Sequence, residues 1–200
     1  MRSVVAYPIA HAPGPVRTPR LRSGPWVFLY PALPRVHKNF EVLGEAARLL
    51  AERGLANLEI RLTIAGHENR YARWLFSRYR HVPGLRFIGV QPHAAMQAQY
   101  EQCDALVFPS RLETWGLPIS EAKAHGKHLI VADLPYAHEA VGDYDAAAFF
   151  DPREPAAVAD LIQAEIEGRS RTAATKTERP APPFTASWPE LMTLLTDGLN

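Results

Sequence analysis

The chain has 200 residues, of which 47% are hydrophobic and 22% are charged, and its formal net charge is +1. This length and composition are typical of a globular domain with a substantial core, and the near-neutral charge argues against nucleic-acid binding, which usually needs a basic stripe. The single cysteine, Cys103, excludes an internal disulfide, and we expect it to be a small buried hydrophobic residue.

No apolar run approaches the roughly 20 residues that a membrane-spanning helix needs. The opening stretch MRSVVAYPIAHAPGP contains an apolar segment that is too short for a secretion signal, because Pro8 interrupts it. We therefore expect a cytoplasmic protein, with peripheral association at the inner membrane left open.

Between residues 26 and 167, short apolar runs alternate with segments that carry an apolar helical stripe. The runs predict strands over Trp26–Tyr30, Leu58–Ala65, Leu85–Ile88, Ala105–Phe108, His128–Val131 and Ala147–Phe150. The stripes predict helices over Phe40–Arg53, about Asn69–Arg80, about His93–Gln102, from Gly116 to His125, near His138, and over Glu154–Glu167. Asn39 is a candidate N-cap for the first of these helices. Repeated strand–helix units predict an α/β fold, a Rossmann-like doubly wound parallel sheet with helices on both faces.

The two ends of the chain differ from this central part. We expect residues 1–24 to form an interdomain segment or N-terminal extension before the predicted Rossmann-like domain, 25–168. Residues 169–187 lack apolar periodicity and predict a linker or an ordered meander. The last segment, 188–200, predicts a helix with Trp188, Leu191, Leu194 and Leu195 on one face. That face has two interpretations: it packs on the sheet of this domain, or it contacts another domain.

The stretch ALVFPSRLETWGLPISEAKAHG, which begins at Ala105, is the most informative part of the sequence. It places Glu113 and Glu121 on either side of a predicted strand–loop–helix junction. Gly116, Leu117 and Pro118 set up the helix start, because proline is favoured in a first helical turn. Free amides and the positive end of the helix dipole make such a helix start an anion site.

A site whose amides bind phosphate and whose carboxylates bind hydroxyl groups suits a nucleotide or a nucleotide-sugar. The other interpretation of the same residues is structural. In that case Glu121 complements the helix dipole from the first turn, and Glu113 is a solvated loop charge.

Seven blocks in fixed order extend the pattern over about 130 residues, which makes a chance match much rarer than for one short motif. They are YPALPRVHKNF from Tyr30, LTIAG from Leu62, LRFIG from Leu85, YEQCDALVFPS from Tyr100, ETWGLPISEAKAHG from Glu113, HLIVADLPYAHEAVGD from His128 and AAFFDP from Ala147. With these blocks and seven residues between Glu113 and Glu121, the chain resembles the C-terminal, donor-binding domain of a retaining glycosyltransferase of the GT-B fold, in the family-four group.

The resemblance implies a role for several residues. Glu121 would hydrogen-bond the ribose hydroxyls, Glu113 would face the donor sugar, and Lys38 would neutralise the diphosphate, so that Lys38 and Glu113 are the catalytic candidates. Further donor-binding candidates are Arg35, Gly66, Thr114, Gly116, Leu117 and Pro118. Family members commonly carry an arginine several residues before the lysine, whereas here Tyr30–Leu33 holds no basic residue. Arg35 is the candidate replacement, although Pro34 restricts its reach.

A lysine at the diphosphate does the work that a divalent metal does elsewhere, so the resemblance implies a metal-independent site without a cofactor. The donor would be a nucleotide-diphosphate sugar, with UDP and GDP as the nucleotides to test. We expect the N-terminal acceptor domain of such an enzyme to be missing from this chain. We therefore expect the donor half of a hexosyltransferase in polysaccharide, lipopolysaccharide or glycolipid synthesis, inactive by itself.

Two alternatives share the fold. One is a non-catalytic module that binds a nucleotide or a partner protein. The other is a sugar-nucleotide epimerase or a sugar-phosphate synthase, and the spacing of the two glutamates argues against the epimerase. The sequence pattern specifies neither the base, the sugar, the acceptor nor the oligomeric state.

Overall fold

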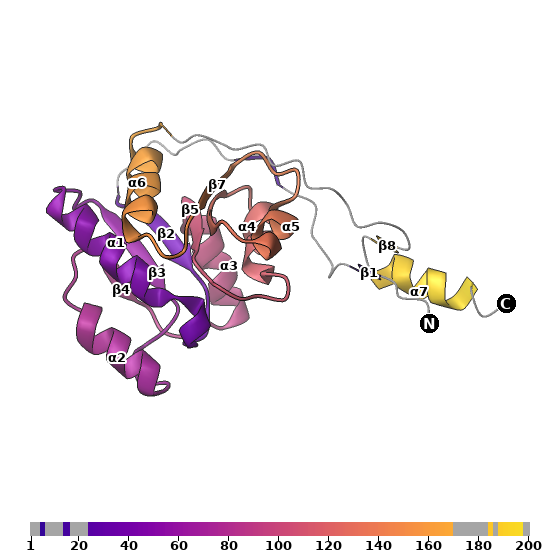
Figure 1. Cartoon of the computed structure of the whole chain (residues 1–200), viewed down its shortest axis with the longest axis horizontal. Coiled ribbons are helices and arrows are strands. Elements are labelled where there is room, and N and C mark those ends of the chain that lie inside the picture. Colours follow the sequence, from indigo (N-terminus) through magenta and orange to yellow (C-terminus); the bar gives the residue numbers. More distant parts are fainter. Residues whose placement is uncertain (1–4, 7–13, 17–23, 170–183, 186–187, 198–200) are drawn as a thin grey trace.

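The computed structural model describes residues 5–6, 14–16, 24–169, 184–185 and 188–197. Its main body is a six-stranded sheet in the order β4-β3-β2-β5-β6-β7 (Figure 1), and all neighbouring strands run parallel. The strands are β2 (Trp26–Tyr30), β3 (Leu58–Leu62), β4 (Leu85–Phe87), β5 (Ala105–Phe108), β6 (His128–Ala132) and β7 (Ala147–Phe150).

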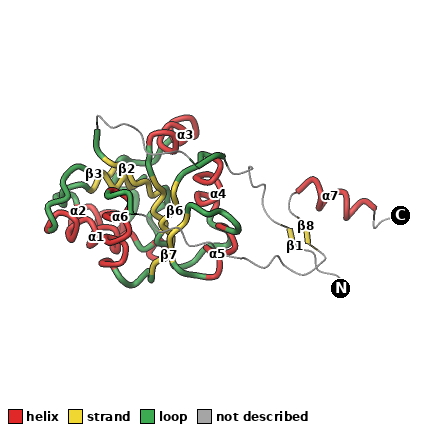
Figure 2. Tube along the Cα trace, turned by 90° about the horizontal axis from the view of Figure 1, so that it is seen from above, coloured by secondary structure: helices red, strands yellow, loops and turns green. Residues whose placement is uncertain are grey.

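Helices cover both faces of this sheet, as Figures 1 and 2 show from two directions. One layer holds α1 (Phe40–Glu52), α2 (Arg70–Tyr79) and α6 (Pro155–Ile166), and the other holds α3 (His93–Gln102), α4 (Leu117–Ala124) and α5 (Pro135–Val141). The predicted doubly wound parallel sheet is confirmed. The chain order reverses between β2 and β5, and open α/β sheets bind their ligands beyond the carboxyl ends of the strands at such a point.

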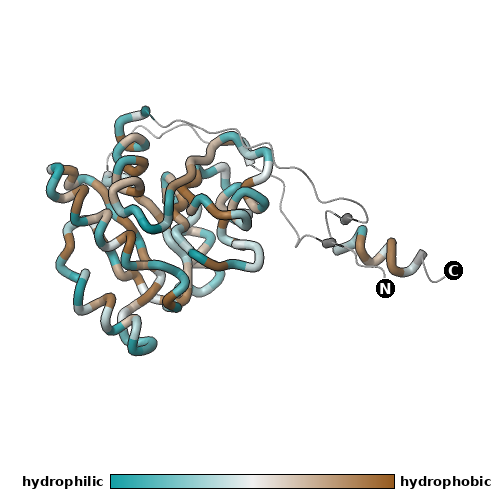
Figure 3. The backbone as a smooth tube through the Cα atoms, in the orientation of Figure 1, coloured by the Kyte–Doolittle hydropathy of each residue, from teal (hydrophilic) through white to brown (hydrophobic). Residues whose placement is uncertain are grey.

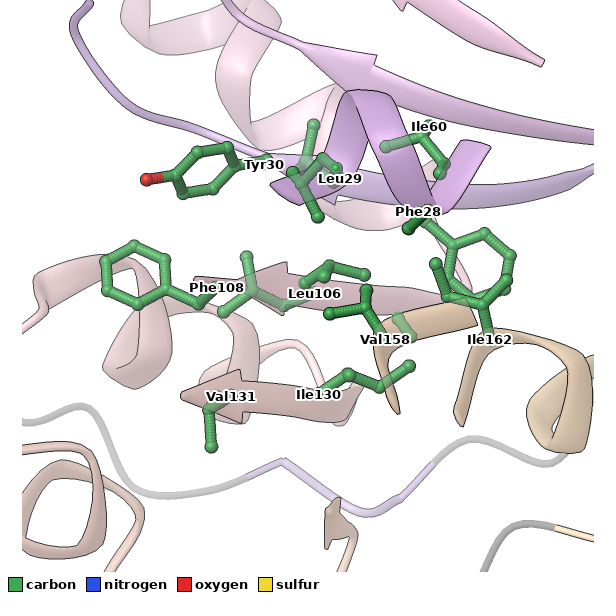
Figure 4. Packing of buried hydrophobic residues seen from close by; sticks show 14 of the residues in the cluster. Phe28, Leu29, Tyr30, Ile60, Leu106, Phe108, Ile130, Val131, Val158 and Ile162 are labelled. Atoms are coloured by element: carbon green, nitrogen blue, oxygen red, sulfur yellow. The ribbon is translucent and has the colours of Figure 1, made fainter. Parts of the chain in front are cut away.

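The core lies between the sheet and its helices. Figure 3 shows hydrophobic residues along the strands and along parts of the helices. In Figure 4, Val158 and Ile162 of α6 point toward side chains of β2, β5 and β6, and both are fully buried. Burying an aliphatic side chain of this size contributes roughly 1.5–3 kcal/mol. Cys103 is buried as predicted, and burial raises the pKa of its thiol to about 12.

Several element bounds differ by one residue from the sequence-based expectations, and two differences are larger. Strand β3 ends at Leu62 instead of Ala65, because Leu62 pairs with Tyr30, the last residue of the neighbouring strand β2. Asn39 lies at the start of α1, but its side chain makes no capping hydrogen bond. Its backbone is left-handed, with φ at 56°, and its side chain points to more distant partners instead.

A second, two-stranded sheet pairs β1 (Val5–Ala6) with β8 (Phe184–Thr185) in parallel, and α7 (Trp188–Asp197) contacts β8. Two-residue strands are too short to show periodicity, so the sequence did not predict this sheet. The Trp188 side chain is 53% exposed, and Leu194 and Leu195 are also exposed. The interpretation that α7 packs this face on the domain's own sheet is therefore wrong. Within the described ranges, every helix is too short or too polar to cross a membrane.

Candidate donor-binding site

The candidate site lies where the chain leaves β2 and β5 at the carboxyl edge of the sheet. These strands are neighbours, with Phe28 opposite Ala105 and Leu29 opposite Leu106. The loop after β2 contains a 3-10 turn, η1 (Val36–Lys38), and the loop after β5 contains Glu113. Adjacent parallel strands therefore deliver a cation and a carboxylate from distant parts of the sequence to one edge.

The two side chains form an ion pair. Lys38 Nζ lies 2.5 Å from Glu113 Oε1, and the side chains are 18% and 12% exposed, respectively. Charged groups so far removed from water are stable only when they are paired. The Glu113 charge also acts on two neighbouring phenols: together with burial, which is the larger cause, it raises the pKa of Tyr30 and of Tyr136.

The backbone around Lys38 is fixed by two buried residues. The Tyr30 hydroxyl donates to the Lys38 carbonyl at 2.6 Å. Asn39 Nδ2 donates to the carbonyls of Pro109 and Pro152, at 3.2 and 2.7 Å, and so ties the lysine loop to the ends of β5 and β7. Asn39 tolerates the left-handed backbone better than most residues, which explains why this residue type follows the lysine.

The loop that carries Glu113 is held from both sides. The Arg111 amide donates to the His37 carbonyl at 2.8 Å, and the Tyr136 hydroxyl donates to the Ser110 carbonyl at 2.6 Å. Trp115 Nε1 donates to Ser120 Oγ of α4 at 3.0 Å. These contacts make the loop part of the folded scaffold, which favours a preorganised site.

The start of α4 offers fewer free amides to an anion than the sequence suggested. Gly116 adopts a left-handed conformation with φ at 80°, and α4 begins at Leu117. Pro118 has no amide hydrogen, and the Ile119 amide donates to the Gly116 carbonyl at 2.8 Å. The amides of Gly116 and Leu117 are therefore the ones that this helix start offers to a phosphate.

Glu121 is held by a buried phenol that the sequence did not reveal as its partner. The Tyr100 hydroxyl of α3 donates to Glu121 Oε2 at 2.6 Å, and Tyr100 is fully buried. Burial and the neighbouring carboxylate raise the pKa of Tyr100. The first turn of α4 contains no acidic residue. The interpretation that Glu121 complements the helix dipole from the first turn is thus wrong.

The other candidates lie around this centre. Arg35 is exposed and has no ion-pair partner within the described part of the chain, and Thr114 is exposed beside Glu113. Gly66 follows β3, and its amide binds Glu68 Oε2 at 2.8 Å. A Cβ at Gly66 would lie 2.5 Å from Phe76, and φ is +94°, so its conformation and packing alone require glycine there. Across the described ranges, no group of three or more His, Cys, Asp or Glu residues could hold a metal ion.

Comparisons with known proteins point to one family. The family model described as "Glycosyl transferases group 1" matches residues 17–179. Glycogen synthase from two strains of Mycobacterium tuberculosis, CDC 1551 and H37Rv, is 28% identical to the chain over 168 residues, which cover 82% of this chain. The chain spans 40% of the length of these curated relatives.

Solved structures share the fold. The Anabaena protein HepE in complex with UDP superposes with a TM-score of 0.63 at 21% identity, over 76% of this chain and 42% of that one. Sucrose-phosphate synthase from Thermosynechococcus elongatus gives a TM-score of 0.60 at 21% identity, over 76% and 39% of the two chains. A glycosyltransferase from Rickettsia africae gives 0.59 at 20% identity, over 73% and 38%.

Proposed function

Because the chain belongs to the family of glycosyl transferases group 1, we propose that it binds the nucleotide-sugar donor of a retaining hexosyltransferase and corresponds to the donor-binding half of that enzyme. The hexosyl product would belong to a polysaccharide, a lipopolysaccharide or a glycolipid. We further propose that transfer requires an N-terminal acceptor domain, since the two reactants must be held in one geometry.

The observation that carries this proposal is the Lys38–Glu113 pair at the switch point between β2 and β5. A pair of opposite charges at that edge offers an ammonium to a diphosphate and a carboxylate to sugar hydroxyls. Lys38 Nζ has three donors, of which Glu113 Oε1 takes one. The remaining donors can bind diphosphate oxygens while the pair stays intact.

The proposed roles follow from these groups. As the bond between the anomeric carbon and the diphosphate breaks, negative charge grows on the leaving group. Lys38 and the Gly116 and Leu117 amides would stabilise that charge, without requiring a metal. Glu121 would accept hydrogen bonds from the ribose hydroxyls, and the Tyr100 hydroxyl would orient its carboxylate.

Calorimetric titration tests the donor site. The purified chain is titrated with UDP, GDP and their common sugar conjugates, first with a chelator and then with magnesium; UDP comes first because HepE was solved with it. We expect one nucleotide to bind equally in both conditions. Glu121→Ala should weaken its binding by about tenfold or more, since a hydrogen bond to a charged group contributes about 1.5–3 kcal/mol.

The matched control is Glu101→Ala, which removes an exposed glutamate from α3 and should leave the affinity unchanged. Equal weakening by both variants would contradict the ribose role, and the absence of binding by every nucleotide would contradict the donor site. Adding an N-terminal half of a related enzyme then tests transfer. Nucleotide binding without any sugar transfer in that mixture would favour the alternative of a non-catalytic module.

A further inference from the structure

Helix α2 and the turn after it carry an unusual concentration of positive charge. Four arginines and no acidic residue occur between residues 70 and 81, in a chain whose formal net charge is only +1. The positive charge is therefore local to this part of the surface. Neither the proposed donor site nor the core uses it.

These charges lie on one side of the helix. Residues three or four positions apart share a helical face, and the exposed side chains follow this spacing. The opposite side, with Ala72, Leu75 and Tyr79, is buried against the domain. We call the exposed basic and aromatic side chains of this set the α2 face, and it consists of Arg70, Arg73, Trp74, Arg78, Arg80 and His81.

The α2 face keeps most of its charge uncompensated. Arg78 pairs with Glu45 at 3.2 Å, but within the described ranges Arg70, Arg73 and Arg80 form no ion pair. The nearest acid in the sequence, Glu68, is turned back onto the amides of Ala65 and Gly66, at 2.5 and 2.8 Å. In the part of the chain that the structure describes, these three exposed guanidinium groups thus have no acidic partner, and Arg80 Nε donates to His81 Nε2 at 2.9 Å.

Trp74 lies among these arginines and is 46% exposed. Its ring stacks on Tyr71, with centroids 6.1 Å apart and an interplanar angle of 15°, and the guanidinium of Arg78 lies 5.9 Å from the ring centroid. Binding a nucleobase by stacking requires an open ring face, whereas an indole at a bilayer surface needs only a free edge among the headgroups. A tryptophan packed in this way favours a lipid surface over a nucleic acid.

We propose that the α2 face docks on the headgroups of an anionic lipid bilayer. Arginines would bind the lipid phosphates, and the Trp74 edge would reach the headgroup region. This inference goes beyond the proposed function and does not depend on it, because vesicle binding requires no nucleotide.

The α2 face is also linked to the loop of the candidate site. At the start of α2, the Asn69 side chain accepts from the Ala72 amide at 2.8 Å and donates to the Pro34 carbonyl at 2.8 Å. Pro34 belongs to the loop that carries Lys38. A domain docked through α2 would therefore hold this loop close to the bilayer surface.

Sedimentation with vesicles tests the proposal. The full chain is mixed with vesicles of phosphatidylcholine alone, or of phosphatidylcholine with phosphatidylglycerol, at low and high salt. We expect binding to the anionic vesicles only, and weaker binding at high salt, because the attraction is screened. The triple variant Arg70→Gln, Arg73→Gln, Arg80→Gln should partition about a hundredfold less, since each basic residue near an anionic surface contributes about fivefold.

The matched control neutralises Arg53, Arg153 and Arg169, three exposed arginines that pair with acids elsewhere, and so changes the net charge equally. It should bind vesicles like the unaltered chain. Circular dichroism must show that both triple variants are folded, as expected for substitutions at exposed positions. As a second probe, Trp74→Ala should weaken vesicle binding by several-fold. Equal binding to neutral vesicles, equal loss in both triple variants, or binding of a single-stranded oligonucleotide in place of anionic vesicles would overturn the proposal.

Discussion

Removing Lys38 should separate the structural role of its ion pair from its role in binding. Lys38→Met leaves the Glu113 carboxylate, which is 12% exposed, without its cation. Breaking a fully buried pair from one side costs about 3–5 kcal/mol. Because both side chains keep some contact with water, we expect a smaller loss, of about 2–3 kcal/mol, in the free energy of unfolding.

The double variant Lys38→Met, Glu113→Gln should recover most of this loss. It removes both charges and keeps side chains of similar size, so no uncompensated ion remains in the site. We expect its free energy of unfolding to lie within about 1 kcal/mol of the unaltered chain. Urea denaturation followed by circular dichroism measures the three values, and an unchanged slope of free energy against urea concentration would show that the unfolding transition is comparable.

Nucleotide binding should respond differently in the same two variants. Both lack the ammonium, so each should bind the preferred nucleoside diphosphate at least about tenfold more weakly, although only the single variant is destabilised. A double variant as unstable as Lys38→Met would show that the charges do not stabilise each other. A double variant that binds the nucleotide normally would refute the role of Lys38 at the diphosphate.

Three further predictions concern neighbouring parts of the fold. Tyr100→Phe removes the hydroxyl that orients the α4 carboxylate, so it should lower the free energy of unfolding by about 1.5–3 kcal/mol and weaken nucleotide binding in the same titration. Gly54→Ala, at φ +77° with open space around it, should cost about 1–2 kcal/mol in urea denaturation, whereas Gly66→Ala also meets Phe76 and should cost about 1–3 kcal/mol more. The hydrogen bond that His128 donates to the Glu165 carboxylate raises the pKa of His128 above its ordinary value of 6.5. The contribution of this pair to stability is therefore complete below 6.5 and is lost as pH rises through the raised pKa. His128→Gln should lack this fall in urea denaturation series across neutral pH, and parallel pH curves for both proteins would contradict the assignment.

The parallel sheet and most of its helices were predictable from local pattern, because buried parallel strands read as short apolar runs between helical stripes. The bounds of α3 and β7 agree with the prediction. The approach of Lys38 and Glu113 follows from the same pattern, since the carboxyl ends of neighbouring parallel strands share one edge. What local pattern could not provide is the partner of Glu121. Tyr100 reaches it from α3 only because of how α3 and α4 pack together.

Asn39 shows the physical reason why local sequence cannot predict such partners. As a residue type, it fits two local structures, a helix N-cap and a left-handed backbone position. The sequence favoured the cap, because an apolar helical stripe follows. In the fold, the side-chain amide of Asn39 donates to the carbonyls of Pro109 and Pro152, which are 70 and 113 residues away. The left-handed backbone of Asn39 turns its side chain toward them. The choice between two locally acceptable conformations was therefore made by partners that only the assembled sheet brings near. Because Lys38 directly precedes Asn39, the same two carbonyls help to hold the lysine opposite Glu113.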